Sequence, residues 1–454
     1  MKNKPKSLSC DTCPGARWTL PFFLVLMLMS ILSLVPGLRP SRSQMEKRDL
    51  APFPEFSAQA LVSGQYFDDI TLWFSDTFPG REGWIQLSSS LESLHGHSEI
   101  QLAGGIPQDS DEIPPEEPVP QVSEVPADST GSSPETTAPT GPDETLPQVP
   151  ADTQEVKELK LGTVIQIGDT SYNYLGFSQI QSDRYAATLS KLADRLQDQG
   201  IRVVSAPAPT AVGIMLDKDR LQAMGCADQE AVIDYLHSSM SDLVIKADTF
   251  HSLADHNREY LYFRTDHHWT ALGAYYSYQA ICDALQMEPA PLESFEPWDQ
   301  GEFQGSIYWK SPNPKKLKND QLWAYIPQGD IVNLVCQNNG AGTERPLLRD
   351  MRDKNLNSKY LTFLWSDNPL CIVTNNSLPD APDCILVKDS FGNCLAPFLT
   401  QNYHNIYAVD YRKYHAMTLA ALAEKYQVRD IIFAPYLTAT QSIDGNDYIA
   451  TRCR

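Results

Sequence analysis

A stretch of 51 residues, Ile106–Val156, divides the chain and limits what can fold. It contains twelve Asp or Glu, no Lys or Arg, eleven of the 33 prolines and no Trp, Tyr or Phe. Such a segment cannot bury enough apolar surface to offset its conformational entropy, so a disordered, acidic, Pro-rich linker is predicted over residues 106–157. Without its twelve acids the formal net charge of −21 becomes −9. No basic surface of the kind that nucleic acids require is left, so no nucleic-acid partner is predicted.

The N-terminus predicts the compartment. Three lysines and Arg17 precede Trp18–Leu38, a run of 21 residues without a charge. About 20 apolar residues span a bilayer, whereas a cleaved secretory signal is usually shorter and ends in a small-residue cleavage site, which is not seen here. A cytoplasmic tail over 1–17 and a transmembrane signal-anchor over 18–38 are therefore predicted, with cleavage as the alternative. The protein is then a single-pass protein of the cell membrane with its main domain extracytoplasmic.

Folded sequence lies on both sides of the linker. Residues 47–105 form the N-terminal part of the extracytoplasmic domain, and because so few residues rarely support a core of their own, they are expected to dock on the main domain, residues 158–454. In the main domain, helical stripes separate short apolar runs typical of strands: Ile201–Val204, Ile385–Val387, Asn405–Val409 and Asp430–Ala434. This alternation predicts a three-layer α/β fold with a largely parallel sheet. In such sheets the chemistry gathers beyond the carboxyl ends of the strands, where Ser390 is placed.

The segment YFRTDHHWTALGAYYSYQAIC, residues 262–282, carries Asp266 and His268 two positions apart. In an extended chain this spacing puts both side chains on one face and His267 on the other. A carboxylate beside a histidine fixes its tautomer and stabilises the imidazolium, as a general base in acyl transfer requires. The alternative is that these polar residues merely cap the helix that follows. Histidines that point in opposite directions do not readily chelate one ion, so no metal site is predicted.

The second segment with candidate catalytic residues is CILVKDSFGNCLAPFL, residues 384–399. In it an apolar strand leads through Asp389 and Ser390 into a helix. A serine on such a turn is exposed, and the backbone N–H groups beside it belong to the positive end of the helix, which can stabilise an oxyanion. Gly392 is expected to let a substrate approach the backbone, and Asn393 to add a side-chain donor. The alternative is that Asp389 or Ser390 is simply the helix N-cap.

Taken together, the string R-T-D-H-H-W-T and the later D-S-F-G-N resemble the DHHW proteins, which are similar to the alginate O-acetyltransferases of the SGNH hydrolase superfamily. The resemblance extends over nearly all of the chain outside the linker and implies an SGNH-hydrolase-like fold. It also implies that Asp266, His268 and Ser390 act together as a catalytic triad. One departure is Lys388, which stands where the superfamily usually has the glycine of G-D-S.

This resemblance predicts a serine-dependent O-acetyltransferase or esterase that acts on cell-surface polysaccharide or exopolysaccharide through the triad, without a cofactor. Arg264, Trp269 and Tyr308 are candidate substrate contacts, since Trp and Tyr offer stacking faces for sugar rings; packing in the core or at the rim is the alternative. The resemblance also implies a partner, a polytopic membrane acyltransferase that exports the acyl group. A non-catalytic surface protein that binds glycan, or an assembly protein of a polysaccharide-modification system, is the competing hypothesis.

Overall fold

The computed structural model describes residues 39–41, 50–54, 56–57, 61, 65–80, 100–103, 106–107, 160–161 and 163–454. The predicted signal-anchor, residues 18–38, and the predicted linker beyond residue 107 lie outside these residues, so both stay predictions. Among the helices of the described part, none is long and apolar enough to cross a bilayer.

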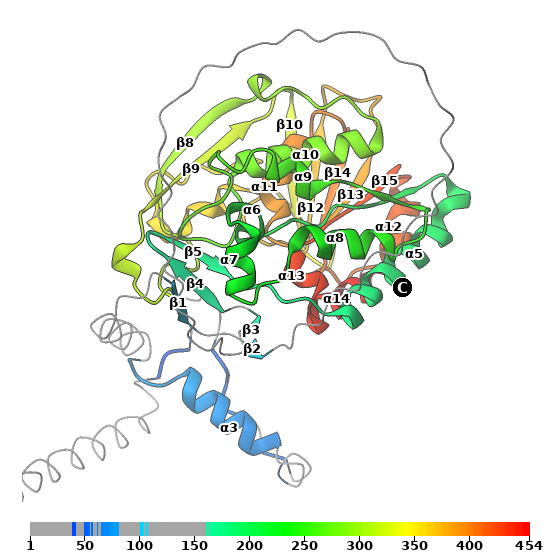
Figure 1. The fold of residues 1–454 in the computed structure, drawn as a ribbon. Helices are drawn as coiled ribbons and strands as arrows, with labels where there is room; N and C mark the ends of the chain where they lie inside the picture. The colour runs from blue at the N-terminus through cyan, green and yellow to red at the C-terminus, as the bar shows by residue number, and fades with distance from the viewer. Residues whose placement is uncertain are drawn as a thin grey trace, which may run out of the picture.

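An eight-stranded sheet lies at the centre of the main domain (Figure 1). Its strands, in spatial order, are β11 (Gly342–Arg345), β10 (Ile331–Cys336), β12 (Leu370–Asn375), β14 (Asn405–Asp410), β13 (Cys384–Lys388), β15 (Asp430–Ala434), β6 (Arg202–Ser205) and β7 (Val244–Lys246). The five strands from β14 to β7 pair in parallel. The mixed α/β fold with a large sheet is thus as predicted.

The other side of the sheet is antiparallel, through the pairings of β14 with β12, β12 with β10 and β10 with β11. The prediction of parallel pairing was therefore wrong for this half of the sheet. For β10 and β11 the physical reason is the connection length, because a parallel pair needs a crossover of a dozen or more residues and these two strands are joined by only the five residues 337–341.

Apolar runs explain why the central strands are found where the sequence predicts them. Every residue of β13 and of β15 is buried, as expected for strands covered on both faces. Two groups of helices pack beside the sheet (Figure 1): α10 contacts α9 and α11, while α14 contacts α5, α12 and α13. The helices are α5 (Gln179–Leu196), α6 (Ala211–Met215), α7 (Lys218–Ala223), α8 (Gln229–Ser238), α9 (Thr249–Ala254), α10 (Ala271–Leu285), α11 (Gly392–Leu399), α12 (Leu419–Tyr426), α13 (Leu437–Thr440) and α14 (Ile443–Cys453).

Of the smaller sheets, one joins the N-terminal part to the main domain. Strand β1 (Ile100–Ala103) pairs with β4 (Val164–Ile167), which pairs with β5 (Thr170–Asn173). Strand β2 (Ile106–Pro107) pairs with β3 (Lys160–Leu161), and β8 (Glu296–Phe303) pairs with β9 (Asp320–Ile326). Ile106 and Pro107 were assigned to the linker from the sequence; they are paired because the two ends of the insertion meet at this point. The N-terminal part also contains α3 (Gln65–Asp76).

Candidate active site

Asp266, His268 and Ser390 are joined by an unbroken series of hydrogen bonds. The Nδ1 atom of His268 lies 2.5 Å from the Oδ1 atom of Asp266, and its Nε2 atom lies 2.7 Å from the Oγ atom of Ser390. An ionised carboxylate only accepts hydrogen bonds, so it keeps a proton on Nδ1 and leaves Nε2 to accept the Ser390 hydroxyl proton. The structure thus brings together the three residues that the sequence singles out, in the arrangement that acyl transfer needs.

The loop that carries Asp266 is closed at its base by a bridge between Tyr262 and Trp269, just before α10. Asp320, the first residue of β9, accepts hydrogen bonds from the backbone N–H groups of Arg264 and Thr265 at 2.8 and 2.9 Å. The loop is therefore a series of bends fixed by a buried carboxylate, and not the extended segment for which the alternation of side chains was expected.

Asp266 is buried, with 3 % of its surface exposed, and both of its oxygens are occupied. Its Oδ1 atom also accepts the backbone N–H of His268 at 3.0 Å, and its Oδ2 atom accepts the backbone N–H of Ser306 at 2.6 Å. Gly305 makes this approach possible, because a Cβ atom there would lie 2.1 Å from the Cβ atom of Asp266. Burial alone would raise the pKa of Asp266, but electrostatic attraction to the His268 and His267 side chains and these hydrogen bonds outweigh burial and hold the pKa well below its usual range.

His267 does not face away from Asp266, as the sequence spacing predicted. Its ring lies 3.9 Å from the ring of His268, and its Nδ1 atom is 3.5 Å from Asp266 Oδ1 and 2.7 Å from Ser306 Oγ. Alternation of side chains holds only in an extended segment, and the bends of this loop put both rings on one side. Burial and then the charge of His268 lower the pKa of His267 to about 3, so its ring is neutral at pH 7.

The turn that carries Ser390 is held by its neighbour Asp389. One carboxylate oxygen of Asp389 accepts the backbone N–H of Phe391 at 3.0 Å, and the other accepts the Tyr411 hydroxyl and the backbone N–H of Tyr436, both at 2.8 Å. These bonds tie the turn to two other segments of the chain. Asp389 therefore fixes the turn, while the Ser390 hydroxyl is left to bond His268.

Tyr360 packs against His268, and the sequence analysis did not identify it. Its ring is stacked on that of His268, with centroids 4.0 Å apart and planes 11° apart, and its hydroxyl donates to the Ser390 carbonyl at 3.0 Å. Tyr360 lies in a 3-10 helix, Leu356–Thr362, about thirty residues before the serine turn. No local pattern in the sequence links this tyrosine to the motif, because the contact is made only by the fold.

Gly392 and Asn393, the predicted oxyanion contacts, both contact groups of the protein itself. A Cβ atom at Gly392 would lie 2.4 Å from the Cβ atom of Lys388, so the glycine makes room for a buried side chain of the protein. The side-chain amide of Asn393 donates to Asp367 at 2.9 Å, and its backbone N–H donates to the Ser390 carbonyl at 3.2 Å. Both donors are thus engaged within the protein, and a developing oxyanion would instead meet the positive end of α11.

The three candidate substrate contacts differ in their surroundings. Trp269 is fully buried and donates from Nε1 to the Phe391 carbonyl at 3.1 Å, so it is a core residue and its predicted sugar contact was wrong. Arg264 lies with its guanidinium 5.0 Å from the ring of Tyr260. Tyr308 is half-buried, and its backbone N–H donates to the carbonyl of Gly305, the residue beside Asp266. Tyr308 and Arg264 stay candidates.

The two adjacent histidines form, with Asp266, a set of potential metal ligands. Ligand atoms of Asp266, His267 and His268 lie within 4.8 Å of one another. However, both ring nitrogens of His268 and both oxygens of Asp266 already form hydrogen bonds. An ion would have to displace the bond to Ser390 or the bond to Asp266. The donor set therefore fits proton transfer better than metal ligation.

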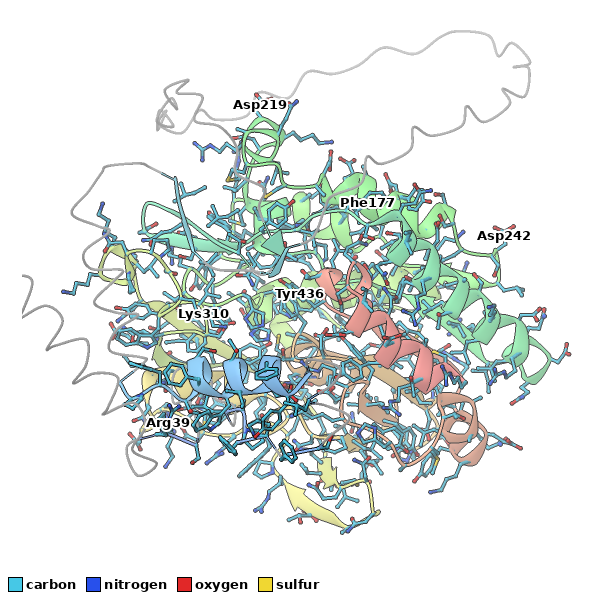
Figure 2. The ribbon with its side chains drawn as sticks, turned by 90° about the horizontal axis from the view of Figure 1, so that it is seen from below. Arg39, Phe177, Asp219, Asp242, Lys310 and Tyr436 are labelled. Atoms are coloured by element: carbon cyan, nitrogen blue, oxygen red, sulfur yellow. The ribbon has the colours of Figure 1, made fainter. Side chains whose placement is uncertain are left out.

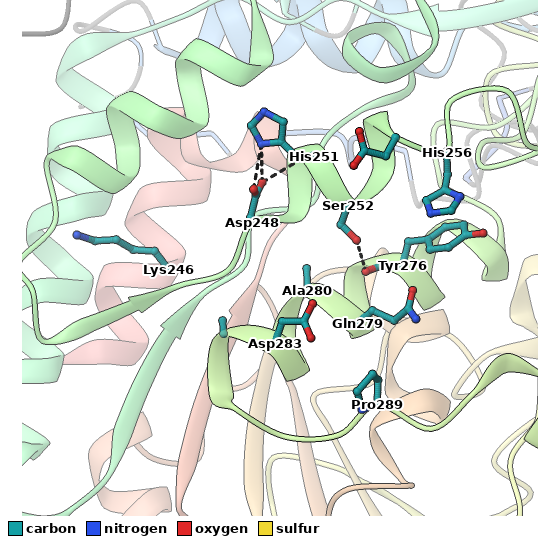
Figure 3. Close-up of a pocket in the computed structure, with 12 residues that line it drawn as sticks. Lys246, Asp248, His251, Ser252, His256, Tyr276, Gln279, Ala280, Asp283 and Pro289 are labelled. Atoms are coloured by element: carbon teal, nitrogen blue, oxygen red, sulfur yellow. Dashed lines mark hydrogen bonds and ion pairs between the residues drawn. The ribbon is translucent and has the colours of Figure 1, made fainter. Parts of the chain in front are cut away.

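A polar pocket of about 570 Å³ lies elsewhere, between α9 and α10, and no residue of the triad lines it (Figure 3). It also contains an Asp–His pair, since His251 Nδ1 lies 2.9 Å from Asp248 Oδ1. The nearby Ser252 hydroxyl donates to the backbone carbonyl of Tyr276 at 2.6 Å and not to that histidine, as Figure 3 shows. The pocket thus lacks a serine activated by a base and does not compete as the site of acyl transfer.

Comparisons with known proteins agree with the motifs. A family model described as DHHW protein matches residues 46–121 and 135–409. The fold is similar to that of a DHHW family protein from Eubacterium siraeum, with a TM-score of 0.57 and 21 % identity over 64 % of this chain and 94 % of that chain. It is also similar to PatB1 of Bacillus cereus, with a TM-score of 0.51 and 15 % identity over 62 % of this chain and 98 % of that chain. A second PatB1 structure, with a sulfonyl adduct, gives a TM-score of 0.52 and 16 % identity over 62 % and 97 % of the two chains. No curated protein sequence matches significantly.

Proposed function

The chain belongs to the DHHW protein family, and on that premise we propose that it is a membrane-anchored, extracytoplasmic O-acetyltransferase or esterase of the SGNH-hydrolase type. The observation that carries the proposal is the series of hydrogen bonds from Asp266 through His268 to Ser390. A structural role alone does not require a serine hydroxyl to be bonded to a histidine whose other nitrogen is held by a buried carboxylate.

The geometry supports a two-step acyl transfer. Ser390 Oγ attacks the carbonyl carbon of an acyl ester while its proton moves to His268 Nε2, and the leaving alcohol then takes that proton as the acyl–enzyme ester forms. In the second step an acceptor hydroxyl loses its proton to Nε2 and attacks the acyl carbon, and Ser390 is released with the proton. Asp266 remains ionised throughout and keeps the Nδ1 proton in place.

The proposed acceptor is a sugar hydroxyl of a cell-surface polysaccharide or exopolysaccharide, with water as the acceptor if the protein is an esterase. This substrate class follows from the resemblance to the alginate O-acetyltransferases. The proposed partner is a polytopic membrane acyltransferase that supplies the acyl group. The PatB1 structure that contains a sulfonyl adduct adds a practical point, since sulfonyl reagents modify activated serines and are therefore a suitable probe for this chain.

The test is covalent labelling of the full chain, purified in detergent, with a sulfonyl fluoride, followed by intact mass and peptide mapping. Wild type is expected to gain one adduct on Ser390 and to hydrolyse p-nitrophenyl acetate. The Ser390→Ala variant is expected to lose both, whereas Ser238→Ala, an exposed serine at the end of α8, is expected to keep both. A wild type that is neither labelled nor active with acetyl donors, yet binds the polysaccharide, would support the non-catalytic hypothesis instead.

A further inference from the structure

Four phenylalanines of the N-terminal part have exposed rings. Phe53 and Phe56 precede α3 and are 59 % and 68 % exposed, while Phe67 and Phe74, on α3 itself, are 60 % and 38 % exposed. Phe67 and Phe74 are seven residues apart and therefore share one face of the helix. These four side chains are here called the aromatic surface. So many exposed aromatic rings within 22 residues are unusual for a surface that meets only water.

Two rings of the aromatic surface contact other aromatic side chains of α3. The ring of Phe53 meets that of Trp73 edge to face, with centroids 4.8 Å apart, and the ring of Phe56 meets that of Tyr66 at 5.5 Å. The exposed rings are therefore held in place by other aromatic rings and do not project as isolated side chains. Such edge-to-face pairs add about 0.5–1.5 kcal/mol each to the burial of area.

Arg39 fastens the start of the described chain to the same helix. Its guanidinium lies 3.9 Å from the ring of Trp73 and 4.9 Å from that of Phe74, and it donates to the Thr77 hydroxyl at 2.7 Å. Figure 2, which views the molecule from the side on which α3 lies, labels Arg39 next to this helix. Arg39 follows directly after residue 38, the last residue of the predicted transmembrane segment. The chain therefore contacts α3 at the point where it would leave the bilayer.

We propose that the aromatic surface is a membrane-docking site that lies in the headgroup region of the bilayer that holds the anchor. Aromatic rings prefer this boundary, and an arginine beside them can bond lipid phosphates. Twelve residues make α3 about 18 Å long, so the helix has room to lie along the surface with Phe67 and Phe74 turned toward the lipid. The inference rests on the predicted anchor and not on the proposed enzymatic activity.

The experiment uses the full chain reconstituted in vesicles of phosphatidylethanolamine and phosphatidylglycerol, with p-benzoylphenylalanine in place of Phe67. Irradiation is expected to give a phospholipid adduct, detected by mass spectrometry of the peptide that contains residue 67. The matched control places the same photoreactive residue at Ile443, which is 63 % exposed on α14, far along the chain from the anchor. The adduct at position 67 is expected to exceed that at position 443 at least tenfold.

A second comparison separates lipid contact from mere proximity. With the photoreactive residue at position 53, the double variant Phe67→Ser and Phe74→Ser is expected to lower the lipid adduct several-fold, while its melting temperature stays close to that of the parent. Equal adducts at positions 67 and 443, or crosslinks to a second protein chain in place of lipid, would overturn the proposal. Neither the lipid adduct nor the melting temperature depends on catalysis. The docking proposal can therefore be tested even if the proposed enzymatic function is wrong.

Discussion

His267 and His268 lie side by side with ring centroids 3.9 Å apart, but of the two only His268 bonds the Ser390 hydroxyl. His267 bonds the Ser306 hydroxyl at 2.7 Å, and the backbone N–H of Ser306 bonds Asp266 at 2.6 Å. In the proposed mechanism His268 transfers the proton, and His267 is a positioning residue that holds Asp266 through Ser306.

This division of roles predicts unequal effects of the two histidines. His268→Ala is expected to abolish labelling of Ser390 and to lower kcat by about 10⁴-fold or more, since nucleophile and base act as a unit. His267→Ala is expected to lower kcat by roughly 10- to 100-fold, as is typical for a group that orients a catalytic residue through hydrogen bonds. Steady-state kinetics with p-nitrophenyl acetate measure both values. A larger loss for His267→Ala than for His268→Ala would reverse the assignment.

Gly305 is predicted to tolerate no side chain, because its Cβ atom would lie 2.1 Å from the Cβ and 2.6 Å from the Cα atom of Asp266. Gly305→Ala is expected to lower the free energy of unfolding by about 1–3 kcal/mol through overpacking. Displacement of Asp266 is expected to lower kcat by about 100-fold. The neighbouring Ser306→Ala keeps the backbone N–H that bonds Asp266 and serves as the control, with a smaller loss. Thermal denaturation and steady-state kinetics measure the stability and kcat of the two variants. Equal losses of stability and of kcat in Gly305→Ala and Ser306→Ala would contradict the prediction.

The pH dependence of stability follows from two half-buried histidines, His237 and His267. Burial, followed by the charge of Lys246, lowers the pKa of His237 to about 4, and the pKa of His267 is lowered to about 3. Both histidines take up a proton in the unfolded chain near pH 6.5 but not in the folded one, so their contribution to stability is complete above that pH and is lost as the pH falls toward 4.

The measurement is urea denaturation at pH 7.5, 6.0 and 5.0. Each histidine contributes a slope of at most about 1.4 kcal/mol per pH unit in this range. His237→Gln removes one of the two, so the variant is expected to lose clearly less stability than wild type between pH 7.5 and pH 5.0. Parallel losses in the two proteins would show that His237 is protonated in the folded state.

The central strands were predictable because their signals are local, whereas the pairing of Asp266 and His268 with Ser390 was expected only from the resemblance to the DHHW proteins. The apolar runs of β13, β14 and β15 identify buried strands, and the turn after β13 exposes Ser390. The antiparallel half of the sheet was not predicted, although β10 and β12 are also rich in apolar residues; both strands mix buried and half-buried residues, unlike the fully buried β13 and β15. Partner strands far apart in the sequence leave no local trace of their pairing direction.

The roles of single side chains proved harder to predict than the elements that carry them. Trp269 stands in a polar string, yet it is buried because its Nε1 atom finds the Phe391 carbonyl 122 residues away. Asn393 lies at the start of a helix, where it was expected to donate to an oxyanion, yet its side-chain amide donates to Asp367. In each case a residue far away in the sequence determines which contact the side chain makes. The spacing of residues along one segment contains no information about that contact.

Lys388 is the residue that departs from the G-D-S pattern, and its surroundings are now defined. Its side chain is fully buried, and its Nζ atom has no hydrogen-bond partner among the described residues. Its charge nevertheless acts on Asp367: burial would raise the pKa of this carboxyl, but Lys388 and then Arg412 outweigh burial and hold the pKa well below its usual range. Arg412 lies 2.9 Å from the Asp367 carboxylate, so Asp367 keeps a bonded cation without Lys388.

Lys388→Met and Asp367→Asn are therefore expected to have opposite effects on stability. Lys388→Met keeps the apolar stem and removes a buried charge that forms no hydrogen bond, so the free energy of unfolding at pH 7 should rise by about 1 kcal/mol with Ser390 labelling unchanged. Asp367→Asn leaves the Lys388 ammonium buried without its counter-charge, and a loss of about 3 kcal/mol is expected. Urea denaturation of both variants measures these differences. A Lys388→Met variant that is destabilised as strongly as Asp367→Asn would show that the ammonium stabilises the serine turn through its charge.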